Sequence, residues 1–190
     1  MPIDLSFRKY AVQSLPKEIG VYVLCDLDEV PIYVGRSSDG IRARVQRHLT
    51  SARSDIIANR QIDVWEIAFV WAFPIQDQTK LGEVESQLFH FYHPRNPLMN
   101  GSILARPKTK LDAAPIPPHK VQVMRDSEIA EKKDPALRLP RQAEHYSQIV
   151  NHFLTVKDSD EIARAMDAHF ARLKRYHNQL LKSALLFADA

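Results

Sequence analysis

The stretch that decides the fold is residues 20–35, which read GVYVLCDLDEVPIYVG. Residues 20–26 and 31–35 are rich in β-branched and aromatic side chains, the types that favour strands. Asp28 and Glu29 stand between the two runs and supply turn residues. Two short β-rich runs joined by a few polar residues predict an antiparallel hairpin.

A helix is predicted directly after this hairpin. Residues 37–40 (SSDG) are typical of a turn, and apolar side chains then recur every four residues, at Ile41, Val45 and Leu49. The positions between them carry basic side chains: Arg42, Arg44, Arg47 and His48. This spacing predicts an amphipathic helix with a strongly basic polar side.

Further along, residues 62–73 (IDVWEIAFVWAF) predict a central strand that Pro74 ends. Residues 79–92 predict a helix, and its buried side is formed by Leu81, Val84, Leu88, Phe89 and Tyr92. A loop with two prolines follows at residues 93–100. We therefore expect an α+β fold with a small, mainly antiparallel, three-stranded sheet flanked by helices.

The composition changes at Arg106. Residues 107–118 contain four prolines and no apolar periodicity, which predicts a linker. Beyond it, residues 142–157 and 160–186 look helical, with Ser159 as an N-cap. We expect three parts: a domain over residues 1–106, a linker over 107–118 and a helical C-terminal region over 119–190.

The last predicted helix has a heptad-like spacing of apolar and histidine side chains. These are Met166, Phe170, Leu173, His177, Leu180 and Ala184. From residue 111 onward the chain has 12 basic and 11 acidic residues, which argues against a strong DNA clamp. Packing on another helix, or a homodimer through the C-terminal helices, is the better prediction, and DNA contact is the alternative.

Composition limits the classes of protein that the chain can belong to. It has 190 residues, of which 45% are hydrophobic, so a folded core is expected. Its single cysteine, Cys25, excludes an intramolecular disulfide and a cysteine metal cluster. Because there is no long apolar run and no leader-like start, we expect a cytoplasmic protein without a membrane partner.

Five features follow one another in a set order along the chain. They are the triplets 20–22 (GVY) and 33–35 (YVG), the pair Arg44 and His48, Glu85 ahead of Leu88 and Phe89, and the turn Pro97-Leu98-Met99-Asn100. Taken singly, each is more often a packing residue or a solvated charge. The ordered set resembles the GIY-YIG nuclease superfamily, over roughly residues 18–105.

The resemblance implies a metal-dependent DNA endonuclease that hydrolyses phosphodiester bonds. It assigns Tyr22 as general base, Tyr33 as the group that positions water or phosphate, and His48 as a partner that shares or receives the proton. Arg44 stabilises negative charge on the phosphate. Glu85 holds Mg²⁺, with Mn²⁺ as the alternative, and Glu83 is its rival for that role. Asn100 orients the loop or a phosphate.

These residue types suit the reaction physically. Mg²⁺ keeps several waters and takes phosphate oxygens as ligands, so one carboxylate such as Glu85 suffices once DNA is bound. Arg44 offers a permanent planar charge that matches phosphate. A free tyrosine has a pKa of about 10. We expect Arg44 and a divalent cation to favour the Tyr22 phenolate.

A local cluster of positive charge predicts the DNA contacts. Residues 36–60 contain six arginines and two aspartates, an excess of four positive charges. Such an excess suits a phosphate backbone. Within it we expect DNA contacts from Arg36, Arg42, Arg47 and Arg53.

Four alternatives remain open from the sequence. The enzyme is either a restriction-type dimer that cuts both strands or a monomeric nicking enzyme of a repair or mobile element. A catalytically inactive nucleic-acid-binding module of the same fold is the third, and an unrelated α/β interaction protein is the fourth.

Overall fold

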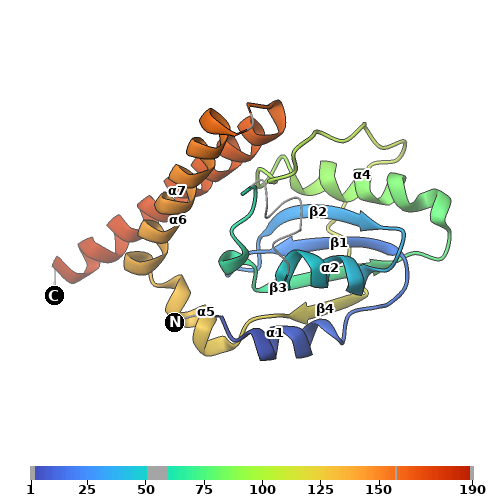
Figure 1. Cartoon of the computed structure of the whole chain (residues 1–190), viewed down its shortest axis with the longest axis horizontal. Helices are drawn as coiled ribbons and strands as arrows, with labels where there is room; N and C mark the ends of the chain where they lie inside the picture. The colour runs from blue at the N-terminus through green and yellow to red at the C-terminus, as the bar shows by residue number, and fades with distance from the viewer. Residues whose placement is uncertain (1–2, 51–59, 157, 189–190) are drawn as a thin grey trace.

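The computed structural model describes residues 3–50, 60–156 and 158–188, with side chains up to residue 183. Within these ranges the chain forms four strands and six α-helices (Figure 1). Every strand pair is antiparallel. The predicted α+β class with an antiparallel sheet is therefore confirmed, whereas the predicted count of three strands is wrong.

The predicted hairpin is confirmed and lies at one side of the sheet. Its strands are β1 (Gly20–Cys25) and β2 (Pro31–Ser37), and β3 (Phe69–Pro74) pairs with the other side of β1. The strand order is β2-β1-β3-β4, so β2 is an edge strand. Its register places Tyr22 opposite Gly35.

The fourth strand is β4 (His119–Gln122), in a segment that we expected to be helical. Val121 lies opposite Val70 of β3. The strand has only four residues, HKVQ, too few to show an alternating pattern, and backbone pairing rather than side-chain preference makes it a strand. Because residues 107–118 form no helix or strand and β4 follows them, the sheet is complete only beyond residue 118.

The strand predicted at residues 62–73 begins later than its composition indicates. Residues 64–66 form the short 3-10 helix η1 (Val64–Glu66), because the Asp63 carboxylate accepts a hydrogen bond from the backbone N–H of Trp65 at 2.9 Å. A second short helix, η2 (Gln78–Lys80), precedes α4 (Leu81–Tyr92).

Helices cover both faces of the sheet. Tyr22 and Leu24 of β1 face a core shared with α1 (Leu5–Val12) and α2 (Ile41–Thr50). Val21 and Val23 face the opposite core, which α4 covers. Alternation along β1 thus separates the residues that meet α2 from those that meet α4.

The C-terminal part consists of α5 (Asp126–Lys133), α6 (Pro135–Thr155) and α7 (Asp160–Ala188). Figure 1 shows α6 and α7 side by side, projecting away from the sheet. The two predicted C-terminal helices are confirmed, although α6 begins seven residues earlier than expected. Ser159 caps α7, since its hydroxyl accepts from the N–H of Ile162 at 3.4 Å.

A buried ion network, which we call the docking network, fastens α6 and α7 to the sheet. Asp26, after β1, accepts hydrogen bonds from Arg172 at 2.9 Å and from Arg175 at 2.8 Å. Arg138 of α6 donates to Glu66 at 2.9 Å. Four carboxylates meet four guanidiniums here: Asp26, Asp28, Asp63 and Glu66 with Arg138, Arg141, Arg172 and Arg175.

Across the described ranges, none of the helices combines the length and the apolar character needed to cross a membrane.

Candidate active site

Tyr22 lies at the centre of the candidate site. It is only 1% exposed, and its hydroxyl lies 2.6 Å from Nε2 of His48 on α2. Tyr33 completes an aromatic group, with ring centroids 6.3 Å from Tyr22 and 6.1 Å from His48. The hairpin and α2 therefore bring together three residues that are far apart in sequence.

The glycine of the second triplet makes this packing feasible. Gly35 lies opposite Tyr22, and a Cβ atom at Gly35 would stand 2.5 Å from the Tyr22 hydroxyl oxygen. The same atom would stand 2.8 Å from Cε1 of Tyr33. Both rings thus lie against a backbone without a side chain, so any larger residue at position 35 would displace them.

His48 and Tyr22 form a neutral pair in the chain itself. Burial, with Arg44 and Arg47 adding to it, lowers the pKa of His48 to about 3. Burial also raises the pKa of Tyr22 well above 10, and the opposing effect of Arg44 is smaller. In the chain alone desolvation outweighs the arginine, so the phenolate that we expect would depend on the divalent cation.

Glu85 approaches β2 from α4. Its side chain is 14% exposed, and Oε2 lies 3.3 Å from Nε of Arg36. Burial raises the pKa of Glu85, and Arg36 acts in the opposite direction. The charge of Glu85 also raises the pKa of Tyr22, so the carboxylate and the phenol are within electrostatic range of each other.

A hollow of about 540 Å³ opens where β2 ends and where α2 and α4 begin. Arg36 and Arg44 both line it. Gly82, in the first turn of α4, also lines it, and a Cβ atom there would stand 2.9 Å from Nη1 of Arg36. The hollow therefore presents two guanidinium groups and the carboxylate of Asp39, beside the Glu85 carboxylate that pairs with Arg36.

The rival glutamate faces another part of the molecule. The Glu83 carboxylate accepts a hydrogen bond from the backbone N–H of Thr109 at 3.0 Å, so it holds the loop beyond α4. Two residues apart on a helix, Glu83 and Glu85 point about 200° apart. Of the two, Glu85 is the one that contacts Arg36.

Asn100 binds the backbone of the edge strand β2 through its side chain. Its side-chain oxygen accepts from the N–H of Val34 at 3.1 Å, and its amide donates to the carbonyl of Val34 at 2.6 Å. Met99 adds a backbone hydrogen bond to Ile32 at 2.8 Å. Because both amide atoms are used in this way, Asn100 holds the loop and the strand together, beside the aromatic group rather than within it.

The expected DNA-contacting arginines divide into different settings. Arg42 donates to the carbonyl of Leu15 at 2.8 Å and so links α2 to the end of α1. Arg47 pairs with Asp39 at 3.4 Å on the surface. Arg53 lies outside the described residues. Of this group, Arg36 is the one that borders the hollow.

Sequence reasoning assigned no role to two of the residues that shape the hollow. Gly82 lines it from the first turn of α4 and Thr79 from η2, where the sequence pattern predicted only a helix. A glycine in the first turn of a helix is a poor helix former, and this was the available signal that something approaches closely there.

Mg²⁺ fits this setting as a one-carboxylate ligand site. In residues 3–50, 60–156 and 158–188, no group of three or more metal-ligating side chains comes together. Glu85 is a half-buried carboxylate near the hollow, and its present partner, Arg36, is 57% exposed and so can move away. Water and phosphate oxygens would have to supply the other ligands.

The arrangement places a hydrogen-bonded proton acceptor, two permanent cations and one carboxylate close together. These are the groups that hydrolysis of a phosphate ester uses: an activated water, charge relief on the phosphate and help for the leaving oxygen. The sequence matches no protein-family model, and no curated protein matches it.

Proposed function

We propose that this chain is a metal-dependent DNA endonuclease of the GIY-YIG type. The observation that carries the proposal is the hydrogen-bonded pair of Tyr22 and His48 beside Arg44, with Glu85 and Arg36 at the same end of β2. A packing role alone would not require a hydrogen-bonded buried phenol and imidazole on the same hairpin and helix that bring Arg36 and Arg44 to one hollow.

In the proposed mechanism, Tyr22 and His48 act as one base. The Tyr22 oxygen takes a proton from the attacking water while its own proton passes to Nε2 of His48, 2.6 Å away. Burial, Arg44 and Arg47 lower the pKa of His48 to about 3, so its imidazole is neutral in the chain itself. The same effects disfavour its protonated form, so the bound phosphate anion would have to offset them for Nε2 to take the proton. This route avoids forming a free phenolate in a buried place.

Arg44 binds the phosphate and balances the negative charge that develops on it. Arg36 leaves Glu85 and turns to a second phosphate oxygen, which frees the carboxylate to hold Mg²⁺ or Mn²⁺. When bound there, the cation polarises the phosphate and stabilises the leaving oxygen. Tyr33 orients the water, and Asn100 keeps the edge of β2 in register.

A homodimer through the C-terminal helices is part of the proposal. The outer surfaces of α6 and α7 expose Leu154 at 73%, Phe170 at 61% and Leu181 at 48%. Two copies would bring two sites to one duplex and allow cleavage of both strands.

The alternative is a nucleic-acid-binding module without activity. Two observations favour it: Tyr22 is a neutral phenol, and Glu85 is already paired with Arg36. In that case the arginines would bind phosphate, but water would not be activated.

Cleavage of supercoiled plasmid in Mg²⁺, and separately in Mn²⁺, tests the proposal. We expect nicked or linear product from the natural chain and none from Glu85→Gln. Glu83→Gln is the matched control and should cut at nearly the natural rate. Linear product would favour the dimer and nicked product the monomer. Binding without any cleavage in either metal would refute the enzyme and leave the module.

A further inference from the structure

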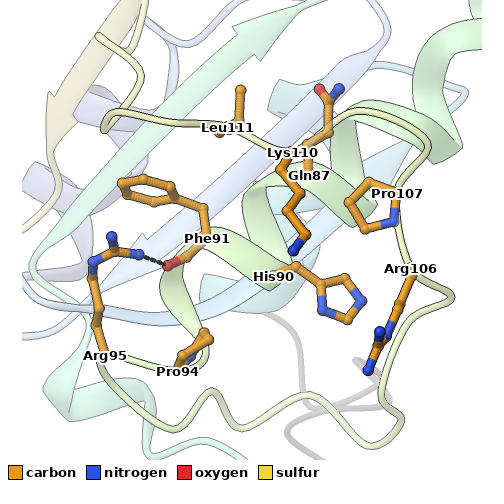
Figure 2. Close-up of a pocket in the computed structure, with 9 residues that line it drawn as sticks. All are labelled: Gln87, His90, Phe91, Pro94, Arg95, Arg106, Pro107, Lys110 and Leu111. Carbon is orange, nitrogen blue, oxygen red and sulfur yellow. Dashed lines mark hydrogen bonds between the residues drawn. The ribbon is translucent and has the colours of Figure 1, made fainter.

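A second hollow, of about 360 Å³, lies on the outer side of α4, beneath the loop of residues 94–111 (Figure 2). We call it the α4 pocket. Its floor is apolar, with Phe91 from the helix and Leu111 from the loop. Its cationic residues are Arg95, Arg106 and Lys110. The size falls within the range of about 300–1,000 Å³ that is usual for small-molecule sites.

Fixed contacts shape this pocket. Nε2 of His90 donates to the carbonyl of Leu104 at 2.9 Å, and the Ser86 hydroxyl donates to the carbonyl of Ala105. Farther along the loop, the N–H of Thr109 is held by Glu83 at 3.0 Å. The loop is thus tied to α4 at several points, and the pocket is formed before any ligand binds.

The guanidinium of Arg95 is held in place on one side of the pocket. It donates to the carbonyl of Phe91, as the dashed line in Figure 2 marks, and its central carbon lies 4.1 Å from the centroid of the Phe91 ring. A flat guanidinium stacked on an aromatic ring offers a surface on which a nucleic-acid base can also stack.

Charge selects the class of ligand. Three cationic side chains line the pocket, and none of its nine lining residues, all of them described, carries a carboxylate. Figure 2 shows Lys110 reaching from the loop toward α4, and Arg106 lies four residues earlier on the same loop. The nearby Glu83 is engaged by the backbone N–H of Thr109. An anion with a flat, partly apolar body therefore fits best, and a nucleotide has that chemistry.

The position relates the pocket to the candidate active site. Glu85 and His90 lie on the same helix, five residues apart, which is about 7.5 Å along its axis and about 140° around it. The α4 pocket therefore lies on the face of α4 that carries Glu83, and the first hollow lies on another face. A strand that occupies both sites would have to pass around α4.

We propose that the α4 pocket binds one nucleotide of a DNA strand, with its phosphate between Arg106 and Lys110 and its base against Phe91 and Arg95. The assignment of a DNA strand as the source rests on the proposed nuclease function. A free mononucleotide shares the same chemistry, and the experiment distinguishes these two sources.

Calorimetric titration of the full chain with 5′-dAMP tests the pocket directly. We expect saturable binding, at least about tenfold tighter than that of inorganic phosphate or deoxyadenosine, because each of these supplies only half of the contacts. The double variant Arg106→Ala/Lys110→Ala should weaken dAMP binding by about tenfold or more. Lys108→Ala, an exposed change on the same loop, is the matched control and should alter it by less than about twofold.

Three results would overturn the assignment: no saturable dAMP binding, equal binding by the double variant, or equal binding of inorganic phosphate or deoxyadenosine.

Plasmid cleavage distinguishes a nucleotide of a DNA strand from a free mononucleotide as the natural ligand of the pocket. If a strand occupies the pocket, the double variant should raise KM at least about threefold with kcat unchanged, and an unchanged KM with intact dAMP binding would refute the strand. Absence of cleavage by the natural chain would count against the nuclease alone, because dAMP binding is measured separately.

Discussion

The candidate active site and the docking network each bury a tyrosine whose hydroxyl meets a nitrogen. Tyr22 is 1% exposed and lies 2.6 Å from His48, whereas Tyr176 is 2% exposed and accepts from Arg138 at 3.1 Å. Around Tyr176, four guanidiniums meet four carboxylates. A hollow near Tyr22 is lined by Arg36, Arg44 and Asp39, and Glu85 pairs with Arg36 beside it.

The difference lies in what completes each cluster. The docking network neutralises itself with residues of the same chain, so it needs no ligand and instead fixes how α6 and α7 sit on the sheet. The ion pairs at the candidate site, Arg36 with Glu85 and Arg47 with Asp39, include exposed side chains beside open space, so a substrate anion could exchange for a carboxylate there. Buried polarity alone therefore does not identify a functional site, whereas exposed ion pairs beside a hollow mark a candidate for one.

The sharpest test makes the same chemical change in both regions. Tyr22→Phe should lower the single-turnover rate of plasmid cleavage by about 10²–10⁴-fold, the usual worth of general acid–base catalysis. Tyr176→Phe should leave that rate within about twofold but destabilise the fold by about 1–2 kcal/mol, because two guanidiniums lose an acceptor. Rates and urea unfolding of both variants measure this contrast.

Two outcomes would contradict the expected difference between Tyr22→Phe and Tyr176→Phe. Natural cleavage by Tyr22→Phe would show that its hydroxyl takes no part in the reaction. A tenfold slower Tyr176→Phe enzyme of natural stability would show that the docking network acts on catalysis.

Breaking the balance of the docking network should cost stability. Asp26→Asn keeps the shape of the side chain but leaves four guanidiniums with three carboxylates, and we expect a loss of about 3–5 kcal/mol in the free energy of unfolding. Urea denaturation at neutral pH measures it. Asp167→Asn, an exposed change on α7, should stay within about 0.5 kcal/mol of the natural chain. Equal stability of both variants would mean that the network is not needed for the fold.

A histidine beside the docking network predicts acid sensitivity. His169 is 1% exposed, and neither ring nitrogen has a hydrogen-bond partner among the described residues. Burial, aided by His145 and Arg172, lowers its pKa from 6.5 to about 3. Between these two values the unfolded chain binds a proton that the folded chain does not, so stability falls as the pH drops below 6.5.

His169→Leu should remove part of this loss. Between pH 7 and pH 5 we expect the variant to lose about 1–2 kcal/mol less of its unfolding free energy than the natural chain does. Urea unfolding at the two pH values gives the difference. His177→Leu, at an exposed position of the same helix, should leave the pH dependence unchanged. If both variants behave alike, buried His169 is not the source of the acid sensitivity.

The smallest expected effect concerns the ion pair of Arg36 and Glu85. Arg36→Ala removes the cation that competes for Glu85, and a partly exposed pair is worth up to about 1 kcal/mol. The Mg²⁺ concentration for half-maximal cleavage at saturating DNA should therefore fall by about two- to fivefold. A higher midpoint at saturating DNA would mean that Arg36 helps to hold the cation instead of competing with it for Glu85.

Local patterns predicted the parts of the fold that local residues decide. The hairpin, α2 and α4 follow from patterns within one segment, whereas Tyr22, Tyr33 and His48 were singled out by the family resemblance. Strand β4 was missed because HKVQ is short and acquires its structure from β3. Residues 62–68 have a strand-like composition, yet the Asp63 cap turns part of them into η1.

Local patterns could not predict which charged side chains pair with each other when the two residues lie far apart in the sequence. Arg172 and Asp26 are separated by 146 residues, and Arg138 and Glu66 by 72. Arg42 was predicted to contact DNA, and the fold adds that its Nε donates to a backbone carbonyl of another segment, a link that its sequence position did not show. A sequence shows which side chains carry charge, whereas only the fold shows which charges are already neutralised.

Strand β4 also has a consequence for how this protein can be recombined. A chimera that joined residues 1–106 to a foreign C-terminal part would lack β4 and leave the N–H and C=O groups of β3 open to pairing with another chain. Such a protein would tend to aggregate even with every candidate catalytic residue in place. Crossover points beyond residue 122 keep the sheet whole, so the smallest exchangeable unit is longer than the segment that carries the motifs.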